Sequence, residues 1–194
     1  MRRVVILLVS SLAIAAWFHS GLPATVCADA DVRDTKSGHW SGGAGLGFLG
    51  QTPDGVLEFA FNGHVDYFLG ERFSIGPLAQ YAGAGNDFIA GLSAQARYWW
   101  DFWGTGGATK LVVQGGLGFV RAGIKDTDSG TADTYGSFLI PIGIGIDHAV
   151  NQRLAVTADF LLNFTSLGDR VRAGGREFDL HTNIMPAFFL GVRF

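Results

Sequence analysis

The residues whose types and spacing could do chemistry are charged side chains. They lie on segments in which apolar and polar residues alternate. We assign six of them to one interior charge network, namely Glu58, Asp66, Arg97, Asp101, Lys110 and Asp159. Both signs of charge are present, and charges enclosed away from water are stable only when they pair. We therefore expect ion pairing rather than catalysis. Arg97 is expected to pair with Asp66 or Asp101, with Glu58 or Asp159 as more distant candidates.

A glycine motif and the histidines predict neither a cofactor nor a metal. Gly45, Gly47 and Gly50 match G-x-G-x-x-G, but a dinucleotide site needs this motif between a strand and a helix. Here residues 51–55, which follow the motif, read as a turn. Beyond the first 30 residues, no pair of histidines has metal-ligand spacing along the chain; these four histidines are His39, His64, His148 and His181. We predict no catalytic residue.

The polar residues lie on segments in which apolar and polar side chains alternate. In residues 56–68, Leu57, Phe59 and Phe61 share one face, and Glu58 and Asn62 lie on the other. This period-2 pattern predicts β-strands. The pattern recurs at 88–102 and 153–165, and in weaker form at 39–49, 72–84, 109–121, 134–147 and 181–194.

Eight such strands, of roughly 10 to 14 residues, are long enough to cross a bilayer when tilted. Short joins (70–71, 104–109, 149–152) alternate with longer connections (50–55, 83–87, 124–134, 166–180). Aromatic residues gather near both strand ends, as interfacial girdles do. The sequence thus predicts an all-β fold, an eight-stranded antiparallel up-and-down transmembrane β-barrel with its apolar face outward. A soluble lipocalin-like barrel is the alternative.

The interior of an eight-stranded barrel is just wide enough for side chains to fill. We therefore expect a largely plugged interior. The inward glycines would leave space, and they keep a gated narrow conduit open as an alternative. They are Gly43, Gly45, Gly47, Gly116, Gly118, Gly143 and Gly145.

The first 30 residues predict export. A short basic start precedes about 15 apolar residues (4–18), and Ala28-Asp29-Ala30 supplies a small-x-small cleavage pattern. Cleavage is expected after Ala30 or, alternatively, after Ala28. Cys27, the only cysteine, lacks a lipoprotein context because Val26 precedes it. The expected domains are a signal peptide (1–30), an N-terminal periplasmic segment (31–37) and an outer-membrane β-barrel (38–194).

The charge of the chain excludes nucleic acid as an expected partner. Without Arg2, Arg3 and Asp29, 12 of the 14 basic and 16 of the 17 acidic side chains remain, a formal charge of −4. Nucleic-acid binding normally requires a basic face.

The last predicted strand ends in an alternating apolar run, Ile184, Pro186, Phe188, Leu190, Val192 and Phe194. It resembles the C-terminal signature of bacterial outer-membrane barrels, in which the barrel assembly machinery reads the terminal Phe. Together with the strand pattern over residues 38–194, it makes the chain similar to the small eight-stranded barrels of the OmpA/OmpX-like family. The resemblance implies residence in the outer membrane, Phe194 as an assembly signal, and a structural or surface-interaction role.

Two other barrel types resemble the chain less specifically. OmpW-type barrels share the topology, and that resemblance implies a narrow, porin-like channel for small solutes or hydrophobic molecules. Lipid A deacylases of similar size carry a His-x-Ser pair, but His181-Thr182-Asn183 has Asn in place of the nucleophile. We therefore predict that the protein is not an enzyme.

Outer-membrane lipid and lipopolysaccharide are the expected partners of a monomeric barrel. The arginines of the longest loop could contact lipopolysaccharide phosphates, although ordinary loop solvation is the explanation that we favour. These arginines are Arg170, Arg172 and Arg176.

Overall fold

The structure, a computed structural model, describes residues 37–50, 57–84, 87–102, 105–125, 132–166, 171–173, 176–178 and 184–194. Within these ranges the chain forms β1 (Trp40–Leu49), β2 (Glu58–Gly70), β3 (Phe73–Ala84), β4 (Asp87–Asp101), β5 (Thr109–Lys125), β6 (Ala132–Ala149), β7 (Ala155–Thr165), β8 (Val171–Ala173), β9 (Arg176–Phe178) and β10 (Ile184–Arg193). No helix long and apolar enough to cross a membrane occurs in the described part of the chain.

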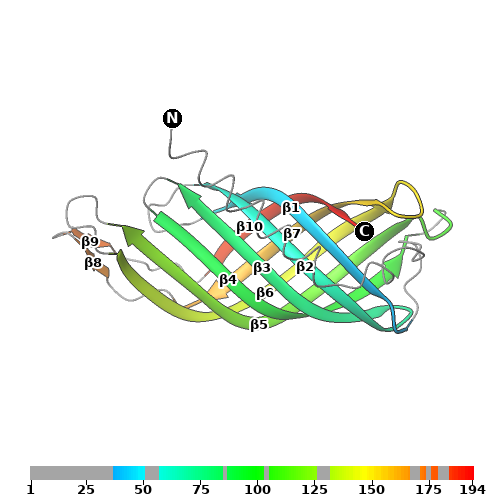
Figure 1. Cartoon of the computed structure of the whole chain (residues 1–194), viewed down its shortest axis with the longest axis horizontal. Helices are drawn as coiled ribbons and strands as arrows, with labels where there is room; N and C mark the ends of the chain where they lie inside the picture. Colours follow the sequence, from blue (N-terminus) through cyan, green and yellow to red (C-terminus); the bar gives the residue numbers. More distant parts are fainter. Residues whose placement is uncertain are drawn as a thin grey trace, which may run out of the picture. The chain divides into compact units, whose positions relative to one another are not determined.

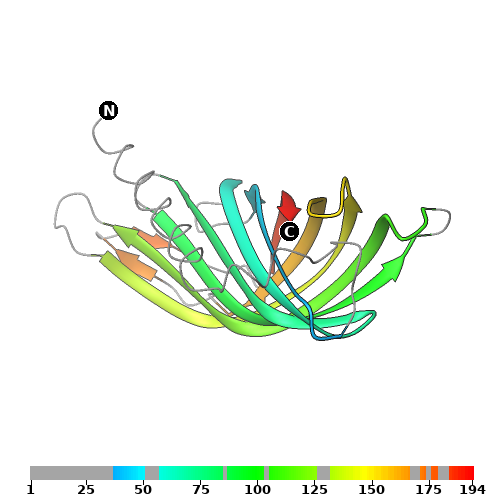
Figure 2. The same ribbon diagram turned by 45° about the vertical axis from the view of Figure 1, so that its right-hand side comes forward.

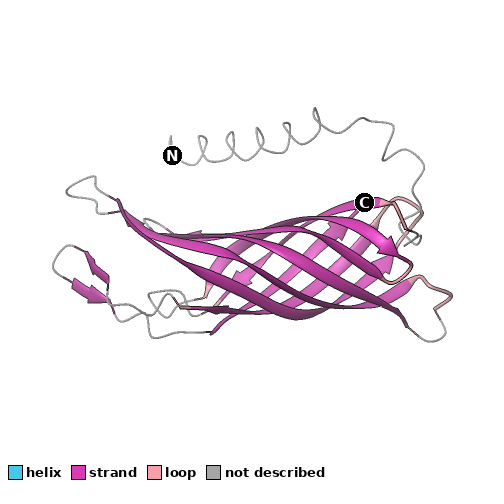
Figure 3. Ribbon diagram, turned by 90° about the horizontal axis from the view of Figure 1, so that it is seen from below, coloured by secondary structure: helices cyan, strands magenta, loops and turns pink. Residues whose placement is uncertain are grey.

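Eight of these strands form a closed barrel in the order β1-β10-β7-β6-β5-β4-β3-β2, and every neighbouring pair is antiparallel. The barrel closes where β1 pairs with β10, from Gly43↔Arg193 to Leu49↔Ala187. The strands wind obliquely around it (Figures 1 and 3). Closure leaves no strand edge unpaired. The predicted all-β, eight-stranded antiparallel up-and-down barrel is confirmed.

The strand bounds lie close to the predicted ranges, with one difference at β5 and β6. Their pairing continues to Lys125↔Ala132, through residues expected to be in a loop, and of the barrel strands these two extend furthest to the left in Figure 1. The backbone N–H and C=O groups of a hairpin hydrogen-bond to each other whether or not its outward side chains are apolar. The apolar alternation therefore ends before the strands do.

The longest expected loop also holds strands that alternation did not indicate. β8 and β9 pair from Val171↔Phe178 to Ala173↔Arg176, while residues 167–170, 174–175 and 179–183 lie outside the described part. The expected last strand, 181–194, is described from Ile184 onward.

The connections β2–β3, β4–β5 and β6–β7 lie at one end of the barrel, which we call the turn end. In the β4–β5 connection Gly106 and Gly107 have φ values of 58° and 80°, which glycine adopts without steric cost. The other four connections define the loop end. Figure 2 shows the long β5–β6 hairpin reaching beyond its neighbours there.

Side chains alternate between the two faces of the barrel wall as predicted. On β2, Phe59 and Phe61 are exposed, whereas Asn62 and Asp66 are buried. On β6, the outward side chains Ile142, Ile144 and Ile146 are about half exposed. An apolar band thus faces outward, and the polar positions face the interior.

The interior itself divides into two parts along the barrel axis. Toward the turn end lies what we call the charged half, with Asp66, Ser74, Arg97, Trp99, Gln114, Asp147, Asp159 and Arg193. Toward the loop end lies what we call the apolar half, where a few polar side chains such as Gln80 and Asn163 are buried beside one large apolar cluster of Leu49, Ala60, Leu78, Ala82, Ile89, Val120, Ala122, Leu139, Leu161, Met185, Ala187 and Phe189. This division positions every candidate site below.

Candidate functional site

Arg97 and Asp66 form the centre of the charged half. Arg97 Nη1 on β4 donates to Asp66 Oδ2 on β2 at 2.6 Å, and both residues are buried. The pair reaches across β3, where Ser74 Oγ donates to Asp66 Oδ1 at 3.2 Å. Both carboxylate oxygens therefore have donors, as a buried charge requires. The pairing expected first for Arg97 is present.

The guanidinium of Arg97 extends this contact toward Asp159. Arg97 Nε donates to Gln114 Oε1 at 3.0 Å, and Gln114 Nε2 donates to Asp159 Oδ1 at 3.1 Å. A continuous hydrogen-bonded network therefore runs from Asp66 on β2 through Arg97 and Gln114 to Asp159 on β7. Strand alternation indicated that these residues share the interior; the bridging role of Gln114 follows from the three-dimensional arrangement.

A second buried ion pair, which we had not assigned to the network, joins β10 to β6. Arg193 Nε and Nη2 donate to Asp147 Oδ2 and Oδ1 at 2.7 and 2.8 Å. A bidentate contact of this kind fixes the orientation of both groups. Alternation predicts that both residues face inward, and both lie near the turn end of their strands. These two features together would have indicated that they pair.

Trp99 connects the two ion pairs. The guanidinium of Arg193 lies 4.9 Å from the centroid of its ring, and its indole Nε1 donates to Ser74 Oγ at 2.9 Å. Phe68 packs against it with ring centroids 5.4 Å apart. The charged half is therefore one connected set of ion pairs, hydrogen bonds and ring contacts.

Among the described contacts, Asp101 pairs with Lys110, a second residue of the predicted network, rather than with Arg97. It ends β4 at the turn-end rim, its side chain is 49% exposed, and Lys110 Nζ lies 3.5 Å from its Oδ1. A strand end at the mouth reaches water, so Asp101 need not pair with Arg97. Glu58 is buried, but it begins β2 at the loop end, eight positions from Asp66.

The histidines occupy separate places. His64 is buried, with Nε2 3.6 Å from Asp66 Oδ2, whereas His148 is exposed and its Nδ1 lies 2.9 Å from Thr109 Oγ1. His39 is half-buried, and His181 lies outside the described residues, as do Asn183 and Arg170. Within the described ranges no three His, Cys, Asp or Glu side chains gather as a metal site would require.

The inward glycines do not leave the space on which the alternative of a narrow conduit depended. A Cβ at Gly43 would meet the His64 ring, and one at Gly145 would meet Asp159 Oδ1. Cβ atoms at Gly47, Gly116, Gly118 and Gly143 would all meet backbone carbonyl oxygens of neighbouring strands. Glycine therefore admits close approach of neighbouring atoms, which already fill the positions that side chains would take.

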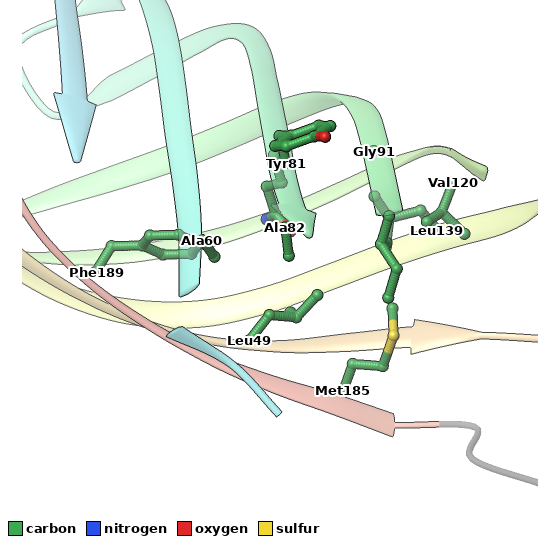
Figure 4. Close-up of a pocket in the computed structure, with 11 residues that line it drawn as sticks. Leu49, Ala60, Tyr81, Ala82, Gly91, Val120, Leu139, Met185 and Phe189 are labelled. Atoms are coloured by element: carbon green, nitrogen blue, oxygen red, sulfur yellow. The ribbon is translucent and has the colours of Figure 1, made fainter. Parts of the chain in front are cut away.

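A small cavity lies in the apolar half. Its volume is about 10 Å³, and Figure 4 shows Leu49, Leu139, Met185 and Phe189 among its lining residues. One water molecule needs about that much room. Asn163 is completely buried on β7, and its side-chain nitrogen and oxygen have no hydrogen-bond partner among the described residues.

Phe194 follows β10 and takes part in barrel closure. Its backbone N–H donates to Gly42 O at 2.8 Å and its carbonyl accepts from Gly42 N at 2.9 Å. Its ring lies about 3.5 Å from the position of a Cβ on Gly42. The last residue is thus fixed at the seam between β1 and β10.

Comparison with known proteins gives structural relatives only. No protein-family model matches the chain, and no curated protein matches it significantly. Among solved structures, the N-terminal β-barrel domain of Pseudomonas aeruginosa OprF aligns at 14% identity over 82% of this chain and 98% of that one, with a TM-score of 0.55.

Two further structures align over similar lengths. Neisserial surface protein A (NspA) matches at 14% identity over 79% of this chain and 94% of its own, with a TM-score of 0.57. Ail, the attachment invasion locus protein of Yersinia pestis, matches at 14% identity over 80% and 96%, with a TM-score of 0.50. The chain has the fold of these small eight-stranded outer-membrane β-barrels.

Proposed function

We propose that this protein is an outer-membrane β-barrel with a structural or surface-interaction role and an occluded interior. The observation that carries the proposal is the division of the wall into an outward apolar face and an inward face that is filled by paired and packed side chains. A soluble barrel would bury its apolar face and expose its polar one.

The height of the outward band supports a membrane location. On β5, apolar or small outward residues run from Leu111 to Phe119. At about 3.3 Å per residue and a tilt of about 40°, this segment covers about 20 Å along the barrel axis, and the side chains at its ends extend it further. The apolar band of outer-membrane barrels is about 25 Å tall.

An occluded interior is the function-determining part of the proposal. An ion crossing the barrel would lose its hydration in the apolar half, whose cavity is about 10 Å³. Desolvating an ion without compensation is costly. The alternative, a narrow channel for small solutes or hydrophobic molecules, rested on space at the inward glycines, and neighbouring atoms occupy that space.

The rest of the proposal follows from the sequence. The loop end would face the cell exterior and the turn end the periplasm, after removal of a signal peptide that ends at Ala30 or Ala28. Phe194, fixed at the barrel seam, would be read by the assembly machinery. The protein would act as a monomer and without enzymatic activity.

Cell fractionation with gel mobility tests this proposal. A closed barrel satisfies its backbone internally and resists cold detergent, so the outer-membrane fraction should contain a form that migrates differently before and after boiling. Deleting residues 1–30 should retain the protein in the cytoplasm. Identical mobility of a verified folded sample, or accumulation of the intact protein outside the outer membrane, would contradict the proposal.

A further inference from the structure

One basic residue interrupts the outward apolar face. Among the described side chains of the eight barrel strands, Arg121 is the only Asp, Glu, Lys or Arg that points outward, and it is exposed. A cation on the outward face of a membrane barrel is unfavourable at the bilayer midplane and nearly neutral at the interface. The position of Arg121 therefore matters.

Arg121 lies just beyond the loop-side edge of the apolar band. On β5 the next outward residue toward the turn end is Phe119, which is 79% exposed, more than any other large hydrophobic residue among those described. In the orientation proposed above, the guanidinium is at the level of the outer-leaflet headgroups, and Phe119 is at the level where the acyl chains begin.

Small residues flank Arg121 and open a hollow around it. Ala90 on β4 and Gly136 on β6 are its register partners, and a Cβ at Gly136 would meet only Val120 O, at 3.9 Å. The hollow is a shallow depression that is open on its outer side, and Leu92, Phe119 and Phe138 line it on the side of the band.

The guanidinium has free hydrogen-bonding capacity in this hollow. Its Nη2 donates to Thr134 Oγ1 at 2.8 Å, and Thr134 lies two residues beyond Gly136 toward the loop end of β6. This contact holds the side chain toward the headgroup level. It uses one of the five N–H groups of an arginine, and no carboxylate among the described side chains pairs with it.

We propose that Arg121 and this hollow form a binding site for lipopolysaccharide, with the guanidinium on a phosphate of lipid A and an acyl chain over Leu92, Phe119 and Phe138. A planar guanidinium matches phosphate oxygens in charge and in geometry. The wall below offers apolar contact, and the small neighbours provide room for the sugar. The inference rests on the proposed orientation of the barrel, which turns the loop end toward the leaflet that carries lipopolysaccharide.

Native mass spectrometry of the refolded chain in detergent tests the site, with phosphorylated lipid A, dephosphorylated lipid A and phosphatidylglycerol as probes. Arg121→Gln should weaken binding of phosphorylated lipid A about tenfold or more, the order expected from losing a charge-assisted hydrogen bond. Gly136→Leu, which keeps the cation but fills the hollow, should also weaken it. Arg72→Gln, an exposed arginine at the turn end, should bind like the wild type.

Three results with lipid A would overturn the inference. They are equal binding by Arg121→Gln and wild type, equal binding of the two lipid A forms by wild type, and unchanged binding by Gly136→Leu. Phosphatidylglycerol binding as tightly as lipid A would also refute the assignment to lipopolysaccharide. Each variant is checked for the heat-dependent gel shift: failure of binding with the shift intact refutes only the site, whereas a wild type without the shift refutes the barrel proposal.

Discussion

The two halves of the barrel interior fill the same narrow space by opposite means. In the charged half, Arg97 and Arg193 are held by carboxylates at 2.6 to 2.8 Å. In the apolar half, Leu139, Leu161 and Phe189 are buried like residues in the core of a soluble protein. The stability of a buried charge depends on its ion-pair partner, whereas the stability that packed apolar groups contribute depends on the volume that they fill. Substitutions should therefore behave differently in the two halves.

The largest effect is expected from Arg97→Met in the charged half. It leaves the buried Asp66 and the half-buried Asp159 without their cation, and losing one member of a buried pair costs about 3–5 kcal/mol. Urea-dependent refolding into lipid or detergent, followed by the gel shift, measures the free energy of unfolding.

The control is the double variant Asp66→Asn with Arg97→Met. It removes both charges and should recover a substantial part of that loss. A double variant as unstable as Arg97→Met would show that the side-chain volume, and not the ion pair, stabilises this half.

Leu139→Ala should cause the corresponding loss of stability in the apolar half. Leu139 is 1% exposed and lines the small cavity, so truncation should cost about 3 kcal/mol through lost contacts and an enlarged cavity. Leu117→Ala on the outward face of β5, where the side chain is 68% exposed, is the matched control for a leucine without interior neighbours. A cost at Leu139 no larger than that at Leu117 would contradict a packed interior.

Gly116→Ala tests whether the interior glycines leave space. Its Cβ would meet Ala94 O and the Gln95 side chain, so overpacking should cost about 1–3 kcal/mol. Gly115, the adjacent outward glycine, has only Pro141 O at 3.9 Å from its Cβ position, and Gly115→Ala should be nearly neutral. If both variants unfold at the same urea concentration, the wall at Gly116 is not closely packed.

The smallest expected effect has the opposite sign. Asn163 is buried in the loop-end half without hydrogen-bond partners, so Asn163→Leu should stabilise the barrel by about 1 kcal/mol, because it removes an unsatisfied amide. Thr157→Ala on the same strand, in the charged half, should give no such gain. Destabilisation by Asn163→Leu would mean that water reaches this half.

Strand number, strand position and face polarity could be predicted from the sequence because alternation is a local property. The pairing of Arg97 with Asp66 was also within reach, since both side chains lie on inward faces. Inward faces together with turn-end positions would also have indicated the Arg193–Asp147 pair. The bridging role of Gln114 could not be predicted, because it depends on how strands β4, β5, β6 and β7 are staggered around the barrel.

The apolar half was missed for a related reason. Alternation distinguishes outward from inward positions, but it does not show that inward apolar residues such as Leu78, Leu139 and Phe189 lie at one height. Whether the inward glycines leave space could not be predicted, because the sequence shows that a side chain is missing but not which neighbour approaches. At Gly145 that neighbour is Asp159.

Conductance of the refolded protein in planar bilayers tests the central claim, an interior occluded by a charged and an apolar half. Insertion is verified by the gel shift of protein recovered from the same preparation. We expect no reproducible single-channel steps from the wild type. If a variant conducts, it should be Leu139→Ala, which enlarges the cavity in the apolar half. Regular steps from wild-type protein, altered by Arg97→Met, would contradict the occluded interior and establish a gated channel instead.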